Sequence, residues 1–332
     1  MSDLYPMLLV PEFKERVWGT RDLRPFYTQV VSHEPIGEAW LTGDECTIAN
    51  GPLKGRKLGE LCSEFGESFV GKAAPVKERF PLLIKFLFPR EKLSVQVHPD
   101  DEGARRIGQP CGKTECWYVA RAIAGAQVGL GVKSGTTREQ FKQAIEKKTA
   151  EQLLNWIDVK TGDLVYVDAG TVHAIGPNAI FIETQQNSDT TYRLYDYGRP
   201  RELHIEQGLE AMKETTHAGK AKSQNIDGHE LLVASPSFIV ERFAAAEPMT
   251  LTSDPGASSA QVLVAADGCG VIECEGSQPV TFNKGEAVVV PANIRQFQLR
   301  PQWNVEFLRM RLPAEKLSHP VTSMPSNGVA TS

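Results

Sequence analysis

The sequence predicts a mainly β protein built as a sandwich or a barrel. Short apolar or alternating runs fill most of the chain, and glycine, proline or asparagine separates them. Residues 229–312 consist almost entirely of such runs. Helical spacing of apolar residues is confined to a few segments. Many short strands with turn signals between them are typical of β-sandwiches and β-barrels.

A weak internal repeat predicts two such units. Residues 162–169 read Gly-Asp-Leu-Val-Tyr-Val-Asp-Ala, and residues 285–292 read Gly-Glu-Ala-Val-Val-Val-Pro-Ala. The alternative is that two unrelated strands share a common pattern. The expected organisation is a catalytic domain at 1–222, a polar linker at about 220–228, a second barrel at 229–315 and a flexible tail at 316–332.

The expected strands of the first unit are apolar or alternating runs that end at turn residues. The run at 113–119 is also rich in aromatic residues, which favour strands. In chain order the strands are expected at residues 15–19, 36–41, 81–88, 93–98, 113–119, 126–130, 163–167, 172–175 and 179–183. The segment 99–112 is rich in Asp, Gly and Pro and is expected to form a loop.

Three segments of the first unit are expected to be helical. Apolar residues recur at three- and four-residue spacing within 57–80. Thr136 is the expected N-cap of a second helix, because Glu139 three residues later would complete a capping box. This helix is expected to run to about Trp156, and a third covers 206–213.

Composition and charge exclude several classes of function. The chain has 332 residues, of which 41% are hydrophobic and 23% charged, as in ordinary globular proteins. A net charge of −5 gives no basic footprint for nucleic acid. No stretch approaches the roughly 18 apolar residues of a membrane span, and no secretory signal is evident. Six scattered cysteines without a C-x-x-C pair indicate reduced thiols, so we expect a cytoplasmic protein.

Four residues form a candidate metal site. Gln96 and His98 are two residues apart on an expected strand, so their side chains point to the same face. Glu115 lies on a second strand and His173 at the mouth of a third. One amide oxygen, two imidazoles and one carboxylate would leave a coordination position open for water or substrate. Zinc, iron, manganese and nickel all accept such ligands, so the ligand types do not fix the metal.

These residues belong to longer motifs that resemble a known family. Two segments resemble the sequence motifs of a cupin barrel. The first is Gln96-x-His98-Pro99, which follows a strand. The second begins at Gly162 and ends in Gly170-Thr171-Val172-His173. Asp168 replaces the usual Pro of the second cupin motif, and Gln96 replaces the usual His of the first. The Gln variant is similar to the type I mannose-6-phosphate isomerases. The matching segments, in that family's order, are 93–101, 113–117, 169–174 and 183–196.

The resemblance covers roughly residues 10–212 and looks like the short bacterial form of that family, which lacks a large helical insertion. Trp18-Gly19 and the segment 36–40 fit the N-terminal signature, although Ala39 replaces the usual Ser. The resemblance implies two cupin (jelly-roll) β-barrels with helical additions. The second barrel has no histidine at 293–298, where the first has His173, so one metal site per chain is expected.

The resemblance also implies an activity and its residues. The activity would be an aldose–ketose isomerisation that interconverts mannose 6-phosphate and fructose 6-phosphate through an enediolate. Gln96, His98, Glu115 and His173 would hold one Zn²⁺. Arg193 matches the family's catalytic arginine, and Lys113 and Glu183 match polar residues of the same pocket.

The residue roles leave alternatives. Glu183 is the first choice as proton carrier, because a buried carboxylate can have a raised pKa, and a hydroxide at the metal is the competitor. Lys113 is preferred as the partner of the phosphate of this small phosphosugar substrate. The other cationic candidates are Arg90, Lys92, Arg199 and Arg201. Two other functions are a cupin oxygenase that uses iron, and a sugar-phosphate-binding cupin without catalysis.

Overall fold

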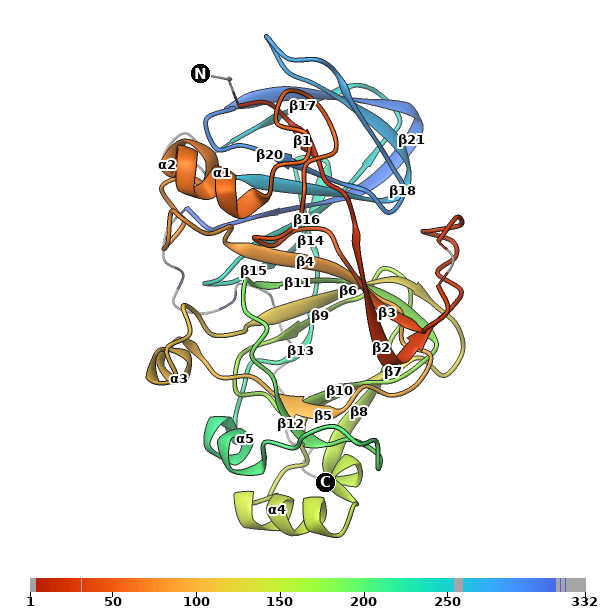
Figure 1. Cartoon of the computed structure of the whole chain (residues 1–332). Coiled ribbons are helices and arrows are strands. Elements are labelled where there is room, and N and C mark those ends of the chain that lie inside the picture. Colours follow the sequence, from red (N-terminus) through yellow and green to blue (C-terminus); the bar gives the residue numbers. More distant parts are fainter. Residues whose placement is uncertain (1–3, 31, 254–258, 315–316, 318–319, 321–332) are drawn as a thin grey trace.

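The computed structural model describes residues 4–30, 32–253, 259–314, 317 and 320. The predicted tail at 316–332 therefore lies outside the described residues, apart from Leu317 and Pro320. The described chain forms three β-sheets, arranged as two barrels side by side (Figure 1). The many strands and few helices confirm the predicted mainly β fold with helical additions. Among the described residues no helix is long and apolar enough to cross a membrane.

Two antiparallel sheets form the first barrel. The smaller sheet has the order β12-β5-β10-β7-β8, and the larger has the order β13-β9-β6-β11-β4-β3-β2. The strands of the smaller sheet are β5 (Val95–Val97), β7 (Gln127–Val132), β8 (Leu154–Asp158), β10 (His173–Ile175) and β12 (Tyr192–Tyr195). The strands of the larger sheet are β2 (Glu12–Thr20), β3 (Ile36–Trp40), β4 (Leu82–Leu87), β6 (Glu115–Ala122), β9 (Leu164–Val167), β11 (Ala179–Gln186) and β13 (Gly219–Lys220).

The core of the first barrel lies between these two sheets. Trp117 and Phe181 of the larger sheet share one buried apolar cluster with Val128 and Ile175 of the smaller sheet. Burial of such side chains is the main force that holds two facing sheets together. This apolar cluster therefore fills the space between the two sheets.

Helices lie around the outside of the two barrels (Figure 1). The helices are α1 (Leu58–Phe65), α2 (Glu67–Val70), α3 (Asp101–Arg106), α4 (Arg138–Glu146) and α5 (Ile205–Ala211), with a 3-10 turn η1 (Ala150–Leu153). α4 and α5 lie against the smaller sheet, at the end of the molecule opposite the second barrel (Figure 1). Phe141 and Ile145 of α4 pack in one cluster with Val95 and Val97 of β5.

The third sheet forms the second barrel. Its order is β1-β20-β18-β21-β16-β15-β14, with β17 on β21 and β19 on β18. Its strands are β1 (Met7–Leu8), β14 (Gln224–Ile226), β15 (His229–Ala234), β16 (Ile239–Ala245), β17 (Met249–Thr252), β18 (Gln261–Glu273), β19 (Val280–Asn283), β20 (Ala287–Val290) and β21 (Gln296–Arg311). β18 and β21 are longer than the short strands that the sequence predicts for residues 229–312.

The internal repeat has the same backbone geometry in both barrels. The N–H of Gly162 donates to the carbonyl of Val119, and the N–H of Gly285 donates to the carbonyl of Ala265, both at 2.9 Å. The two glycines have φ values of +90° and +88°, a region that glycine adopts without strain. β9 and β20 follow these turns. The turn therefore aligns the two barrels residue by residue, with Val119 equivalent to Ala265.

A strand from the N-terminus and a common apolar cluster join the two barrels. β1 comes from the N-terminus but pairs with β20, with Met7 opposite Val289. One apolar cluster includes Met7, Phe86 of the first barrel and Val262 of the second. The proposed linker at 220–228 begins with the last residue of β13 and contains β14, and these strands pair with β9 and β15 respectively. The division at 1–222 and 229–315 remains a prediction about domains.

Two local predictions were wrong. The second helix is capped by Thr137, whose side chain accepts from Gln140 at 3.2 Å, and it ends at Glu146. Trp156 lies on β8, because pairing with β7 replaces helical hydrogen bonds there. The expected loop at 99–112 contains α3, which Asp100 caps by accepting from the N–H of Gly103 at 2.9 Å.

Candidate metal centre

The alternation of β5 places Gln96 at the mouth of the first barrel. Val95 and Val97 are fully buried under α4, so Gln96 projects from the opposite face into a cavity. β5 lies between β12 and β10, and His173 at the start of β10 is in register with Gln96. Strand pairing therefore brings together residues that are 77 positions apart in the sequence.

Three of the predicted ligands form a compact cluster. Nε2 of His173 lies 3.2 Å from Oε1 of Glu115, and Nε2 of His98 lies 3.4 Å from Oε2 of the same carboxylate. Each of the three side chains is 1% exposed. In the part of the chain that the structure describes, this is the one group of three or more His, Cys, Asp or Glu residues close enough to hold an ion.

Hydrogen bonds fix both imidazoles in the form that binds a cation. Nδ1 of His98 lies 2.9 Å from the carbonyl oxygen of Thr190, and Nδ1 of His173 lies 2.9 Å from that of Thr171. A carbonyl oxygen only accepts, so each Nδ1 carries the proton and each Nε2 keeps a free lone pair. This arrangement is usual for histidines that bind a metal through Nε2.

The charges of the cluster also suit a cation. Burial and the nearby positive charge of Lys113 lower the pKa of His98 to about 3. Burial likewise lowers the pKa of His173. Burial alone would raise the pKa of Glu115, but Lys113 and the two imidazoles outweigh it and hold that pKa well below the ordinary value. At neutral pH the cluster therefore has two neutral imidazoles and one carboxylate.

The donor set fits a divalent metal. Oε1 of Glu115 is buried and makes no hydrogen bond within the described residues, so it is free to coordinate. Gln96 presents Nε2 to His173 at 3.2 Å, while its Oε1 accepts from Ser94 at 3.0 Å. A half-turn of the amide would present Oε1 to an ion instead. The site therefore supplies three ligand atoms directly and a fourth after rotation.

Lys113 lies at the edge of this cluster. Its side chain is 3% exposed, and its Nζ contacts Oε2 of Glu115 and lies 3.0 Å from Nε2 of His98. An ion at the cluster would compete with the ammonium group for these two ligands. Binding of an ion would therefore displace the Lys113 ammonium group from these two atoms.

A cavity of about 440 Å³ opens beside the cluster and contains the other predicted residues. Lys113, Glu115, Glu183 and Arg193 all line it, together with Gln96. Such a volume is in the range of small-molecule sites. The predicted ligand set and the predicted catalytic set thus lie at one place in the fold.

Glu183 is held in this cavity by two neighbours. The indole N–H of Trp117 donates to Oε1 at 3.0 Å, and Nζ of Lys85 lies 2.9 Å from Oε2. Burial raises the pKa of Glu183, against the opposing effect of Lys85. The sequence reading missed Lys85, although a lysine within the apolar run 81–88 is the signal that could have identified it.

Arg193 reaches the cavity from β12. One Nη donates to the carbonyl of Glu202 at 2.9 Å, and Nε is buried without a hydrogen-bond partner among the described residues. Burial and the positive charge of Arg201 lower the pKa of Arg193. Arg201 also lines the cavity, and Asp196 holds it through two contacts of 2.7 Å. The sequence reading also missed Arg16, which lines the cavity and pairs with Glu38 at 2.9 Å.

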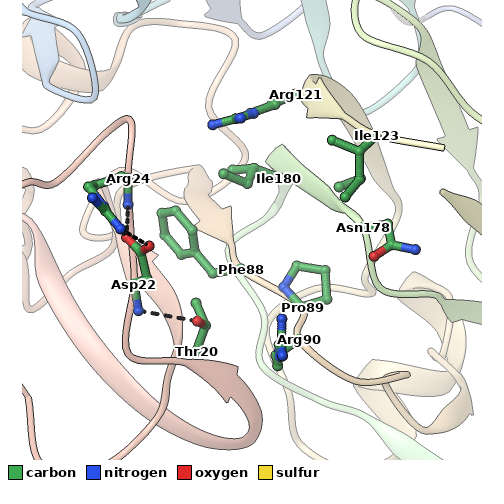
Figure 2. Close-up of a pocket in the computed structure, with 11 residues that line it drawn as sticks. Thr20, Asp22, Arg24, Phe88, Pro89, Arg90, Arg121, Ile123, Asn178 and Ile180 are labelled. Carbon is green, nitrogen blue, oxygen red and sulfur yellow. Dashed lines mark hydrogen bonds and ion pairs between the residues drawn. The ribbon is translucent and has the colours of Figure 1, made fainter. Parts of the chain in front are cut away.

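The remaining cationic candidates lie elsewhere. Arg90 lines a separate pocket of about 320 Å³ with Arg24 and Arg121, over a floor that includes Phe88 (Figure 2). Lys92 pairs with Glu151, and Arg199 pairs with Asp196, each at 2.8 Å. These three cations do not line the cavity beside the metal cluster.

The fold and this site define the chain as a two-barrel cupin protein whose first barrel has a cluster that could hold a metal ion. Residues 7–118 match the family model described as the catalytic domain of type I phosphomannose isomerase. A mannose-6-phosphate isomerase of Streptococcus mutans is 35% identical over 306 residues, which is 88% of this chain and 94% of that protein. A putative mannose-6-phosphate isomerase of Bacillus subtilis is 33% identical over 317 residues, which is 89% of this chain and 96% of the relative.

A solved structure agrees with the sequence matches. The crystal structure of a Bacillus subtilis mannose 6-phosphate isomerase superimposes with a TM-score of 0.82 at 31% identity, and covers 92% of this chain and 99% of that one. The chain belongs to the type I phosphomannose isomerase family. This confirms the resemblance that the motifs of the sequence indicate.

Proposed function

We propose that this protein interconverts mannose 6-phosphate and fructose 6-phosphate, with Zn²⁺ as its metal. The observation that carries the proposal is the His98–Glu115–His173 cluster at the wall of a cavity that also holds a buried carboxylate and several cationic side chains. Relatives that match most of the chain are named for this isomerisation. When bound, the metal would act as a Lewis acid that stabilises negative charge on a substrate oxygen.

Glu183 is the proposed proton carrier. The reaction moves one proton between C1 and C2 of the open-chain sugar while the carbonyl group changes place. Trp117 occupies Oε1 of Glu183, whereas Oε2 makes no hydrogen bond within the described residues. A carboxylate whose pKa is raised by burial can both take and return a proton near neutral pH. We assign proton transfer to Oε2, which carries the ion pair with Lys85 at 2.9 Å but no hydrogen bond among the described residues.

Cationic side chains are proposed to hold the phosphate and the substrate oxygens. Arg193 has an unused Nε at the cavity and a guanidinium that can donate two parallel hydrogen bonds. The contacts with Asp196 already fix the side chain of Arg201. Its positive charge is therefore in place before substrate binds. Lys113 remains the candidate closest to the metal cluster. Charged walls of this kind favour a phosphorylated sugar over the apolar substrate of an oxygenase.

A coupled assay for fructose 6-phosphate tests the function. The wild type should form product from mannose 6-phosphate, lose activity with a chelator and recover it with Zn²⁺. His98→Ala should lose bound metal and activity together, because it removes one of three direct ligands. Arg193→Ala should keep one metal per chain and lose kcat. A wild type that binds the substrate without turnover, or an iron form that consumes oxygen, would overturn the proposal.

The free thiols support the proposed cytoplasmic location. All six cysteines are unpaired, and Cys46, Cys62 and Cys116 are buried. Reduced, buried thiols are typical of proteins in a reducing compartment.

A further inference from the structure

A second pocket of the first barrel has an excess of positive charge. Its volume is about 320 Å³, which is in the range of small-molecule sites, and it shares no lining residue with the cavity beside the metal cluster. Three arginines line it, from the loop after β2, the turn after β4 and β6: Arg24, Arg90 and Arg121 (Figure 2). Among the described residues that line the pocket, Asp22 is the one acid. Cationic groups therefore outnumber anionic ones here, in a chain whose net charge is −5.

Asp22 neutralises one of the three arginines. Its carboxylate accepts from Nε of Arg24 at 2.7 Å and from Nη2 at 2.5 Å. These contacts with Arg24, and to a smaller extent the charge of Arg121, lower the pKa of Asp22 to about 2, so the pair is ionised at neutral pH. The side chains of Arg90 and Arg121 make no hydrogen bond or ion pair within the residues that the structure describes. Two guanidinium groups of the pocket are therefore available to a ligand.

The backbone fixes the positions of these two arginines beside an apolar floor. The N–H of Arg90 donates to the carbonyl of Trp18 at 2.9 Å. Arg121 is in register with Ile180 of β11, which also lines the pocket. Phe88 forms part of the floor and is 2% exposed. An apolar floor lowers the local dielectric constant, which strengthens the attraction between a guanidinium and an anion.

We propose that this pocket binds a phosphorylated small molecule whose carbon part packs on the floor at Phe88. A phosphate dianion balances the two available guanidiniums in charge, and each of them can donate parallel hydrogen bonds to its oxygens. Thr20 supplies a further donor, because its Oγ1 accepts from the N–H of Asp22 at 3.2 Å and keeps its own proton for a ligand. A carboxylate carries one negative charge and would leave one guanidinium without an anion. The inference is independent of the proposed isomerisation, since it concerns a different pocket.

Protection of arginines from chemical modification tests the proposal in the metal-loaded enzyme. Phenylglyoxal modifies accessible arginines, and mass spectrometry identifies each modified side chain. Phenyl phosphate should protect Arg90 and Arg121, whereas the exposed Arg295 between β20 and β21 should react at an unchanged rate. Benzoate has the same ring but a single negative charge, so it should protect the two arginines at concentrations about tenfold higher or more.

Reciprocal variants test whether the two arginines share one ligand, with Arg295→Gln as the matched control. Arg121→Gln removes one guanidinium, so the phenyl phosphate concentration that half protects Arg90 should rise about tenfold or more. Arg90→Gln should have the same effect on the protection of Arg121, and Arg295→Gln should have none.

Three results would contradict the inference. The first is the absence of protection at Arg90 and Arg121, including protection confined to Arg193 and Arg201 of the cavity beside the metal cluster. The second is protection by benzoate at the same concentrations as by phenyl phosphate. The third is a shift in Arg295→Gln equal to that in Arg121→Gln.

Discussion

Glu183 and Glu241 are both buried carboxylates, and their neighbours give them opposite chemical behaviour. Burial raises the pKa of Glu183, whose Oε2 is buried and makes no hydrogen bond within the described residues. For Glu241 burial acts in the same direction, but hydrogen bonds and charge from Arg309 and Arg311 outweigh it and lower the pKa. The first carboxylate can exchange a proton, whereas the second is a fixed anion that stabilises the fold.

Because Glu241 is an anion in the folded protein, we expect the free energy of unfolding to depend on pH. The folded pKa of Glu241 lies below its unfolded value of about 4.3, so its contribution is fully present above that pH and is lost as the pH falls through the folded pKa. Glu241→Gln should therefore cost about 3 kcal/mol of unfolding free energy at pH 7. The difference from the wild type should shrink towards pH 3. Urea unfolding at the two pH values measures it, and a pH-independent difference would contradict the assignment.

At the scale of elements, short strands deliver the ligands and helices hold those strands in place. β5 has three residues, and its two valines pack with α4 and α5 in one cluster. This packing fixes the face of β5 from which Gln96 projects. A shift of the strand register by one residue would bury the amide of Gln96 and expose the two valines. α4 therefore supports the position of Gln96 without contacting the cavity.

The cap of α4 gives a prediction with a matched control. Thr137→Ala removes the side chain that accepts from Gln140, so it should lower stability by about 1 kcal/mol. Thr136→Ala changes the neighbouring threonine, which lies outside the cap, and should change stability by less than about 0.5 kcal/mol. Thermal unfolding compares the two variants. Equal losses, or a larger loss for Thr136→Ala, would place the helix start one residue earlier than the structure does.

At the scale of the whole molecule, the described residues contain one scaffold twice and the candidate ligand set once. Glu115 is in register with Val167 on β9, and Gln261 is in register with Val290 on β20. The shared glycine turn makes Gln261 the equivalent of Glu115. A neutral amide at this position removes the charge that a divalent cation needs most. The second barrel instead packs against the first through a common apolar cluster.

The structure brings the four candidate ligands together as the sequence predicts, whereas some element boundaries differ from the prediction. Gln96, His98, Glu115 and His173 could be foreseen because alternation on strands fixes the direction of a side chain. Lys85 could not be assigned a role, because its partner Glu183 is 98 residues later and the pairing of β4 with β11 is not local. Likewise, pairing with β7 ended the predicted helix before Trp156. Contacts between distant segments decided each of these cases.

The N-terminus shows the same limit. Met7 and Leu8 read as an ordinary short apolar run, yet they form the edge strand of the second barrel. Nothing in so short a run specifies its partner. The two barrels are therefore joined by β1 at the N-terminus as well as by the connecting segment at 220–228.

The central claim is that Glu183 moves a proton between C1 and C2 beside the metal centre. Isomerisation of mannose 6-phosphate in D₂O, followed by NMR, tests it most directly in the wild type and in Glu183→Gln with one metal per chain. We predict that the wild type incorporates solvent deuterium at the exchanging carbon and that Glu183→Gln neither isomerises nor exchanges. Exchange by Glu183→Gln at the wild-type rate would contradict the account.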